Sequence, residues 1–145
     1  MFHTILVPTD GSELADKAIQ AAVAFAKANQ GKVIGLSVAE PYPFSPLGET
    51  AFVPDLETYE KGMRGLAELH VQKVMDAASK AGVPCEVVTA LSFDPAEEIV
   101  NSARKYGCDA IFIATHGRRG MNRLLLGSVT QKVLVNAQVP VVVYR

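Results

Sequence analysis

Five short apolar segments, separated by stretches with helical spacing, set the pattern of this chain. They are Thr4–Val7, Val33–Val38, Cys85–Ala90, Ala110–Ala114 and Val139–Tyr144. The first is continuously apolar, which is typical of a strand covered on both faces. Glu86 and Thr89 interrupt the third, which suggests an outer position. Because strands that alternate with helices produce parallel sheets, the pattern predicts an α/β fold.

Four helices are expected between and after these strands, because apolar residues recur at intervals of three and four positions. They are predicted over Leu14–Asn29, Leu56–Gly82, Asp94–Gly107 and from Ser128 to about Asn136. The sequence Asp94-Pro95-Ala96-Glu97 is a strong helix start, with an Asp cap, a Pro in the first turn and a Glu reaching back. Gly62 and Gly65 weaken the first half of the second helix.

We expect a single-domain, open five-stranded parallel sheet of the Rossmann-like type, with strand order 3-2-1-4-5 and helices on both faces. In this order the carboxyl ends of the first and fourth strands flank the crevice in which such sheets bind ligands. Those ends are Thr9-Asp10 and Ala114-Thr115-His116-Gly117. Two segments that are distant in the sequence are therefore predicted to meet at one cleft.

Glycines and arginines follow the fourth strand. Gly117 and Gly120 lie in a loop that contains Arg118, Arg119 and Arg123, and Gly127-Ser128 begins the last helix. A glycine loop before a helix presents backbone N–H groups to an anion, and the helix dipole favours negative charge there. Arginines can clamp phosphate oxygens. We interpret this stretch as a phosphate-holding loop.

Two simpler interpretations of the same residues stay open. Ser128 and Gln131 could form only a capping box for the last helix. The arginines could form only a solvated basic face.

The loop resembles the ATP-binding signature of the universal stress protein family, which is a glycine, two residues, a glycine, nine residues, and then glycine with Ser or Thr. The second glycine falls on Gly117 and the final pair on Gly127-Ser128. Ala114 stands at the first glycine position, a departure that adds a methyl group against the ribose. The segments VPTDGS and VPVVVYR resemble the same family. Residues 1–145 are therefore expected to form one nucleotide-binding domain.

The resemblance implies a site for ATP, with Mg²⁺ arriving with the phosphates. Val38 matches the position whose backbone bonds the adenine edge, and Asp10 the position that contacts the adenine or the metal-phosphate side. The implied nucleotide-binding residues are Pro8, Thr9, Asp10, Val38, Ala114, His116, Gly117, Arg118, Gly127, Ser128, Val129 and Thr130.

Several of these residues also have ordinary structural interpretations. Asp10 with Glu13 fits a capping box for the first helix, and Ser12 could do the same work. Val38 could be a buried strand valine. His116 could bond a phosphate, act as a general base or only position the loop.

The expected function is that of an ATP-binding regulatory module of the stress response. The sequence has no Walker lysine, GxGxxG motif or metal cluster. No nucleophile for phosphoryl transfer is evident either, so activity is expected to be at most slow ATP hydrolysis or self-phosphorylation. One alternative is a nucleotide-free dimeric interaction protein, which Ala114 favours and which would use the proline-rich segment Glu40–Pro54. Another is an AMP-forming transferase of the wider adenylate-binding group.

Net charge and composition limit the classes of partner that we expect for this chain. A formal net charge of −1 gives no reason to expect nucleic acid or an anionic membrane. No apolar run approaches the roughly 20 residues that span a bilayer, and no signal peptide is evident. Cys85 and Cys108 match no metal or redox spacing, so we expect free thiols in the cytoplasm.

The last apolar segment is expected to be a long edge strand, which invites self-pairing. The family resemblance implies a homodimer through this strand. Arg145 and a neighbouring helix could instead cover it.

Overall fold

The computed structural model describes residues 2–42, 55–117 and 125–145. The predictions for Gly120, Arg118, Arg119 and Arg123 concern residues outside these ranges, as do those for most of the proline-rich segment.

The described residues form one parallel sheet of five strands in the order β3-β2-β1-β4-β5, which confirms the predicted fold and strand order. The strands are β1 (Thr4–Pro8), β2 (Lys32–Ala39), β3 (Cys85–Leu91), β4 (Ala110–Ala114) and β5 (Val141–Tyr144). β5 begins later than predicted because Pro140 has no N–H to donate to the ladder. The Pro140 carbonyl still accepts a bond from the Ile111 amide (2.9 Å).

Four helices connect and follow the strands. They are α1 (Glu13–Ala28), α2 (Leu56–Ala81), α3 (Pro95–Lys105) and α4 (Ser128–Asn136). Asp94 caps α3 as predicted, since its carboxylate accepts from the Glu97 amide (3.1 Å). The Asp94 amide itself donates to Ser92 Oγ (3.1 Å), so the prediction that Glu97 reaches back to this amide is wrong.

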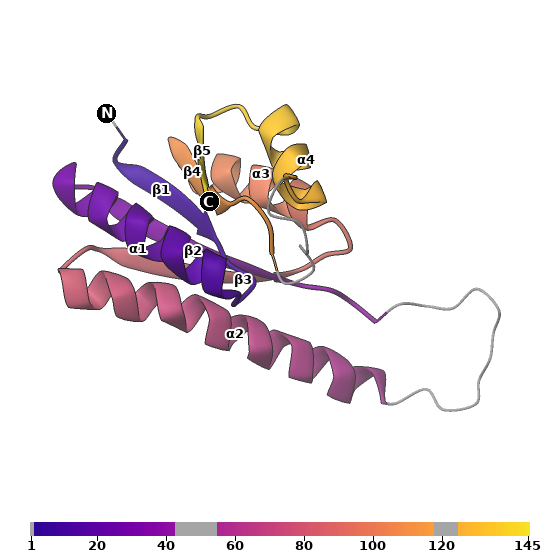
Figure 1. Ribbon diagram of the computed structural model, residues 1–145. Coiled ribbons are helices and arrows are strands. Elements are labelled where there is room, and N and C mark those ends of the chain that lie inside the picture. The colour runs from indigo at the N-terminus through magenta and orange to yellow at the C-terminus, as the bar shows by residue number, and fades with distance from the viewer. Residues whose placement is uncertain (1, 43–54, 118–124) are drawn as a thin grey trace.

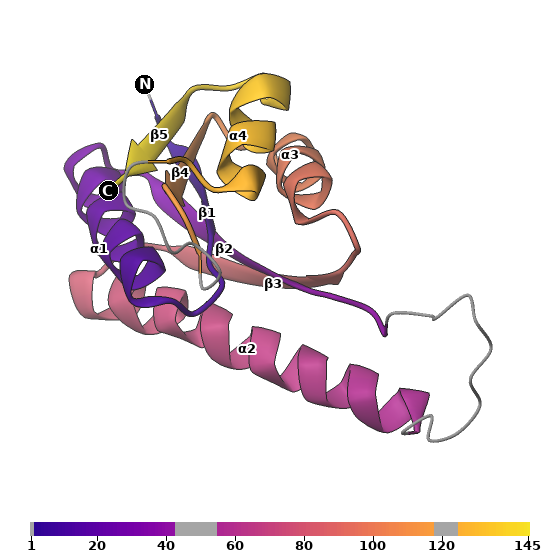
Figure 2. The ribbon, with the colours of Figure 1, turned by 45° about the vertical axis from the view of Figure 1, so that its right-hand side comes forward.

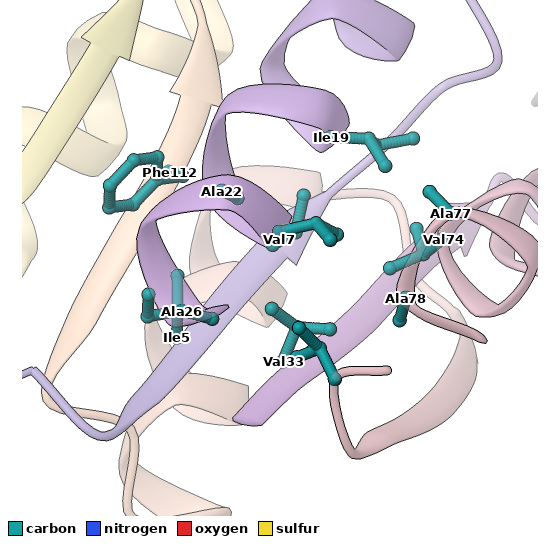
Figure 3. Close-up of a cluster of buried hydrophobic side chains, with 12 residues drawn as sticks. Ile5, Val7, Ile19, Ala22, Ala26, Val33, Val74, Ala77, Ala78 and Phe112 are labelled. Carbon is teal, nitrogen blue, oxygen red and sulfur yellow. The ribbon is translucent and has the colours of Figure 1, made fainter. Parts of the chain in front are cut away.

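The helices cover both faces of the sheet, with α1 and α2 on one side and α3 and α4 on the other (Figures 1 and 2). Alternate residues of one strand enter two separate cores, because successive side chains point to opposite faces. Ile5 and Val7 join the α1–α2 core, whereas Leu6 joins the α3–α4 core. Figure 3 shows the first core, in which Phe112 of β4 and Val74 of α2 also take part.

The α2 helix is long relative to the sheet that it covers. Its 26 residues correspond to about 39 Å at about 1.5 Å per residue. The buried residues of α2 begin at Ala67 and continue with Val71, Val74, Ala77 and Ala78, so mainly its carboxyl-terminal half packs on the sheet. The amino-terminal half projects past the carboxyl ends of the strands (Figures 1 and 2).

Candidate functional site

The turn between β1 and α1 is held by hydrogen bonds. The Thr9 amide donates to the Leu36 carbonyl (2.8 Å), which ties the turn to β2. The Gly11 amide donates to Thr9 Oγ1 (3.1 Å), and the Ser12 amide to Asp10 Oδ1 (3.0 Å). Gly11 has a φ of 77°, in the left-handed region that favours glycine. Pro8 and Thr9 are buried and Asp10 is half-buried, so the turn presents the Asp10 side chain.

Ser12, rather than Asp10, caps α1. Its Oγ accepts a hydrogen bond from the Ala15 amide (3.2 Å). The interpretation of Asp10 and Glu13 as a capping box is therefore wrong, and the Asp10 carboxylate serves the turn instead.

Asp10 and Gly117 lie against each other. A Cβ built on Gly117 would overlap Oδ2 of Asp10. The predicted meeting of the segments that follow β1 and β4 is therefore confirmed. The absence of a side chain at Gly117 leaves room for the carboxylate.

The segments that flank the basic loop are joined by their own bonds. The Thr115 amide donates to the Tyr144 carbonyl (2.8 Å), and the Gly127 amide donates to the Thr115 carbonyl (2.7 Å). The buried Thr130 Oγ1 donates to the Ala114 carbonyl (2.8 Å). These bonds hold the start of α4 against the carboxyl end of β4, so Gly127–Thr130 lies beside His116 and Gly117.

The first turn of α4 carries no side-chain cap among the described residues. Gly127 is the N-cap, and its carbonyl accepts the first intrahelical bond, from the Gln131 amide (3.0 Å). The Gln131 side chain instead donates to the Leu126 carbonyl (2.7 Å), so the proposed Ser128–Gln131 capping box is wrong. The amides of Ser128, Val129 and Thr130 precede the first residue that has an intrahelical acceptor. Such amides are suited to an anion.

A cavity of about 530 Å³ opens beside this junction. Its described lining comes from α1, from the segment after β4 and from the chain end: Ser12, Glu13, Leu14, Lys17, Thr115, His116, Gly117 and Arg145. Of the predicted site residues, His116 and Gly117 line it. Sequence reasoning missed Lys17 and Arg145, because spacing alone does not say which side of α1 turns toward the end of β5.

His116 is positioned by its neighbour. Its ring is half-buried, and Nδ1 lies 3.1 Å from Thr115 Oγ1. This contact orients the imidazole at the cavity and leaves Nε2 as the other polar atom of the ring.

Val38 lies on the other side of the β1–α1 turn. Its half-buried side chain packs on the α3–α4 core, and it pairs with Ala90 of β3. The neighbouring Ser37 points to the opposite face, where its Oγ lies 3.4 Å from His70 Nδ1 of α2. Val38 is not part of the described cavity lining. The predicted site residues that the structure describes therefore form a strip along the carboxyl ends of the strands, with the cavity at one end.

Ala114, the departure from the glycine signature, is the last residue of β4. It is 7% exposed, so its methyl group is almost completely buried. Its carbonyl accepts the Thr130 bond, which ties this position to α4.

The described residues contain neither a candidate metal cluster nor a membrane-spanning helix. No three His, Cys, Asp or Glu side chains there gather closely enough to hold a metal ion. None of the described helices combines the length and apolar character needed to cross a membrane.

Comparison with known proteins identifies the family of this chain. A model of the universal stress protein family matches residues 1–145. Universal stress protein MJ0531 of Methanocaldococcus jannaschii is 34% identical over 148 residues, covering all of this chain and 83% of the relative. Universal stress protein YxiE of Bacillus subtilis is 31% identical over 149 residues, covering both chains fully.

Solved structures agree. MJ0577 of M. jannaschii superposes with a TM-score of 0.83 at 27% identity, covering 99% of this chain and 96% of that one. A universal stress protein in complex with cAMP superposes with a TM-score of 0.71 at 26% identity, covering 99% and 97%. The match along the whole sequence and the shared sheet together show that this chain belongs to the universal stress protein family.

Proposed function

We propose that this protein binds ATP, with Mg²⁺, in the crevice at the carboxyl ends of β1 and β4, and that it acts as a regulatory module of the stress response. The observation that carries the proposal is the junction of Asp10 with Gly117 beside the uncapped first turn of α4. The carboxylate of Asp10, the backbone of Gly117 and the open amides of α4 then lie along one strip.

The residues present fit a nucleotide. A Cβ on Gly117 would overlap Asp10 Oδ2, and one on Gly127 would come within 3.3 Å of His116 Cα and of the Thr115 carbonyl oxygen. Both glycines therefore allow their segments to pack closely beside the first turn of α4. The amides of Ser128, Val129 and Thr130 would hold phosphate oxygens, assisted by the helix dipole. Mg²⁺ would supply charge neutralisation between those oxygens.

The end of the strip at Val38 is suited to the adenine base of the nucleotide. The Val38 backbone would bond the adenine edge, and Pro8, Thr9 and Asp10 would form the adjoining wall. The nearly buried methyl group of Ala114 supports binding in spite of the missing glycine. The relative solved with cAMP supports an adenine nucleotide as the ligand class. His116, at the cavity, would orient the phosphates.

The same geometry favours binding over rapid catalysis. Apart from His116, the described cavity lining supplies the cations of Lys17 and Arg145 and the carboxylate of Glu13. In-line phosphoryl transfer also requires a positioned nucleophile. At most slow hydrolysis or self-phosphorylation is proposed.

A direct experiment tests ATP binding. The purified protein is denatured, its supernatant is analysed by mass spectrometry for adenine nucleotides, and nucleotide-free protein is titrated with Mg-ATP by calorimetry. We expect bound or titratable ATP. Protein that purifies free of nucleotide and gives no heat would identify the alternative, a nucleotide-free interaction protein.

A substitution tests the location. Gly127→Leu places a branched side chain against Thr115 and His116, next to the first turn of α4. ATP binding should therefore be lost while the circular dichroism spectrum is retained. Gly62→Ala, where a Cβ meets nothing within 4 Å, is the matched control and should bind ATP normally. Unchanged affinity in Gly127→Leu would refute the phosphate assignment.

We also propose a homodimer through β5. This strand lies at one sheet edge, and Val142 is 40% exposed there. Further exposed apolar side chains lie on or next to α4: Leu125, Leu126, Leu134 and Val135. An apolar edge strand can pair with a second copy about a two-fold axis.

Light scattering after gel filtration tests the dimer. Val142→Asp should convert it to a monomer. Val87→Asp, at a residue that is 37% exposed on the opposite edge strand, is the control and should leave the dimer intact. A dimeric Val142→Asp variant, or a monomeric wild type, would exclude pairing through β5.

A further inference from the structure

His70 of α2 contacts both chain segments that adjoin the predicted adenine side of the site. Its Nδ1 lies 3.4 Å from Oγ of Ser37, which is 2% exposed and directly precedes Val38. Its ring also covers Gly11, which directly follows Asp10, because a Cβ built on Gly11 would overlap the imidazole. The His70 side chain thus contacts the segments at the carboxyl ends of both β1 and β2.

The packing of α2 on β2 produces this position. A Cβ on Gly35 would approach Val74 Cβ to 2.9 Å, so the missing side chain allows the helix to lie close to the strand. β2 and β3 are parallel neighbours joined through α2, so the helix runs back along the sheet. Two residues along a strand cover about 6.6 Å and four along a helix about 6 Å. The distance from Gly35 to Ser37 along β2 therefore matches the distance from Val74 back to His70 along α2, which places His70 opposite Ser37.

Lys73 adds a second attachment between the same helix and the same turn. Its Nζ donates to the Gly11 carbonyl (3.3 Å) and to the Asp16 carboxylate (3.0 Å and 3.1 Å). The Lys73 and Asp16 side chains are 45% and 42% exposed, so solvent screens this ion pair and it contributes little by itself. The half-buried His70 contact is the stronger candidate for fixing the turn.

We infer that His70 is a positioning residue for the nucleotide site: it holds the Gly11 turn and the Ser37–Val38 strand end in the arrangement that binds the base, and it thereby couples α2 to occupancy of the site. This inference rests on the proposed function. Because His70 fixes both segments before the ligand arrives, less ordering remains to be done on binding. By reciprocity, bound nucleotide stabilises the contacts of α2 with the sheet.

The two isosteric replacements of His70 give a sharp test. His70→Asn keeps an amide atom at the place of Nδ1, and with it the Ser37 contact, but it lacks the ring edge that lies against Gly11. His70→Gln puts its amide at the place of Nε2 and loses the Ser37 contact. We expect the Asn variant to lose less Mg-ATP affinity than the Gln variant, which should bind about tenfold more weakly than the wild type, within the usual range of coupling between sites. Leu69→Ala, on the same turn of α2 but 67% exposed, is the control and should bind as the wild type does.

A double-mutant cycle and hydrogen exchange complete the experiment. Ser37→Ala should weaken ATP binding as His70→Gln does. The double variant should lose no more affinity than either single variant, because both substitutions remove the same contact between Ser37 and His70. Mg-ATP should slow amide exchange in the middle of α2 in the wild type and in His70→Asn, and not in His70→Gln. Affinities are measured well below the melting temperature of each variant, so that all are folded.

The outcomes separate the inference from the proposal on which it rests. Equal affinity of the wild type, His70→Gln and Ser37→Ala, with only lower melting temperatures, would assign His70 a purely structural role and overturn the inference alone. Equal losses in His70→Asn and His70→Gln would also overturn it. A wild type that binds no ATP would overturn both the proposed function and this inference.

Discussion

The carboxylate of Asp10 occupies the space that a side chain at Gly117 would need. These residues follow different strands, and they meet because β1 and β4 are neighbours in the sheet. The contact makes Gly117 a spatial requirement of the site.

Gly117→Ala should therefore weaken ATP binding by at least about tenfold, because the new methyl group displaces Asp10, a loss of about 1.4 kcal/mol. Calorimetry with Mg-ATP measures the change. In an Asp10→Ala background the carboxylate is absent, so adding Gly117→Ala should cause little further loss. An equal further loss in that background would show that the two residues act independently.

Thr130→Val should destabilise the fold by about 1–2 kcal/mol, because the buried Ala114 carbonyl loses its side-chain donor while the volume is nearly conserved. The start of α4 should also detach from β4, which weakens ATP binding. Urea unfolding and calorimetry measure the two effects. Thr130→Ser keeps the hydroxyl and should retain the hydrogen bond. Equal destabilisation by Ser and Val would attribute the effect to packing instead.

Gly62→Ala and Gly65→Ala should each raise the free energy of unfolding by about 1 kcal/mol. Both lie inside α2, and a Cβ at either meets nothing within 4 Å, so only the helix propensity changes. Urea denaturation measures the gain. Gly35→Ala is the contrasting control and should destabilise, because its methyl group would press on Val74. A loss of stability in Gly62→Ala would contradict the helix as described.

The two thiols should differ in reactivity. Burial raises the pKa of Cys108 to about 11, and the nearby Asp109 carboxylate adds to the shift. Burial also raises the pKa of Cys85, which is less enclosed. The thiolate is the reactive form, so a raised pKa lowers the thiolate fraction at neutral pH, and alkylation should accelerate only as the pH rises toward the pKa.

Timed iodoacetamide labelling followed by peptide mass spectrometry measures this order. Cys85 should label before Cys108 at pH 8, and both should label at the rate of a free thiol in denaturant. Faster labelling of Cys108 in the native protein would contradict its burial.

Most of the fold was predictable because the local patterns were strong and consistent. The continuous apolar run of β1, the Asp94-Pro95 start of α3 and the Gly82 end of α2 each act through nearby residues. The strand order was inferred from the usual course of open α/β sheets, in which the chain steps outward from the first strand and then returns to its other side. The likeness of Gly117 and Gly127-Ser128 to a family signature identified the family before the fold was known.

What the sequence by itself determined was therefore the order of strands and helices, the family, and the two segments that would meet at the sheet end. Only the tertiary structure decided that Ser12 rather than Asp10 caps α1, that Gln131 leaves the first turn of α4 without a side-chain cap, and that His70 lies beneath Gly11 and Ser37. Several side chains near a helix start can serve as its cap, and the local sequence does not choose among them. The contact of His70 depends on how closely α2 approaches β2, and this distance is set by the pairing of Gly35 with Val74 across the fold.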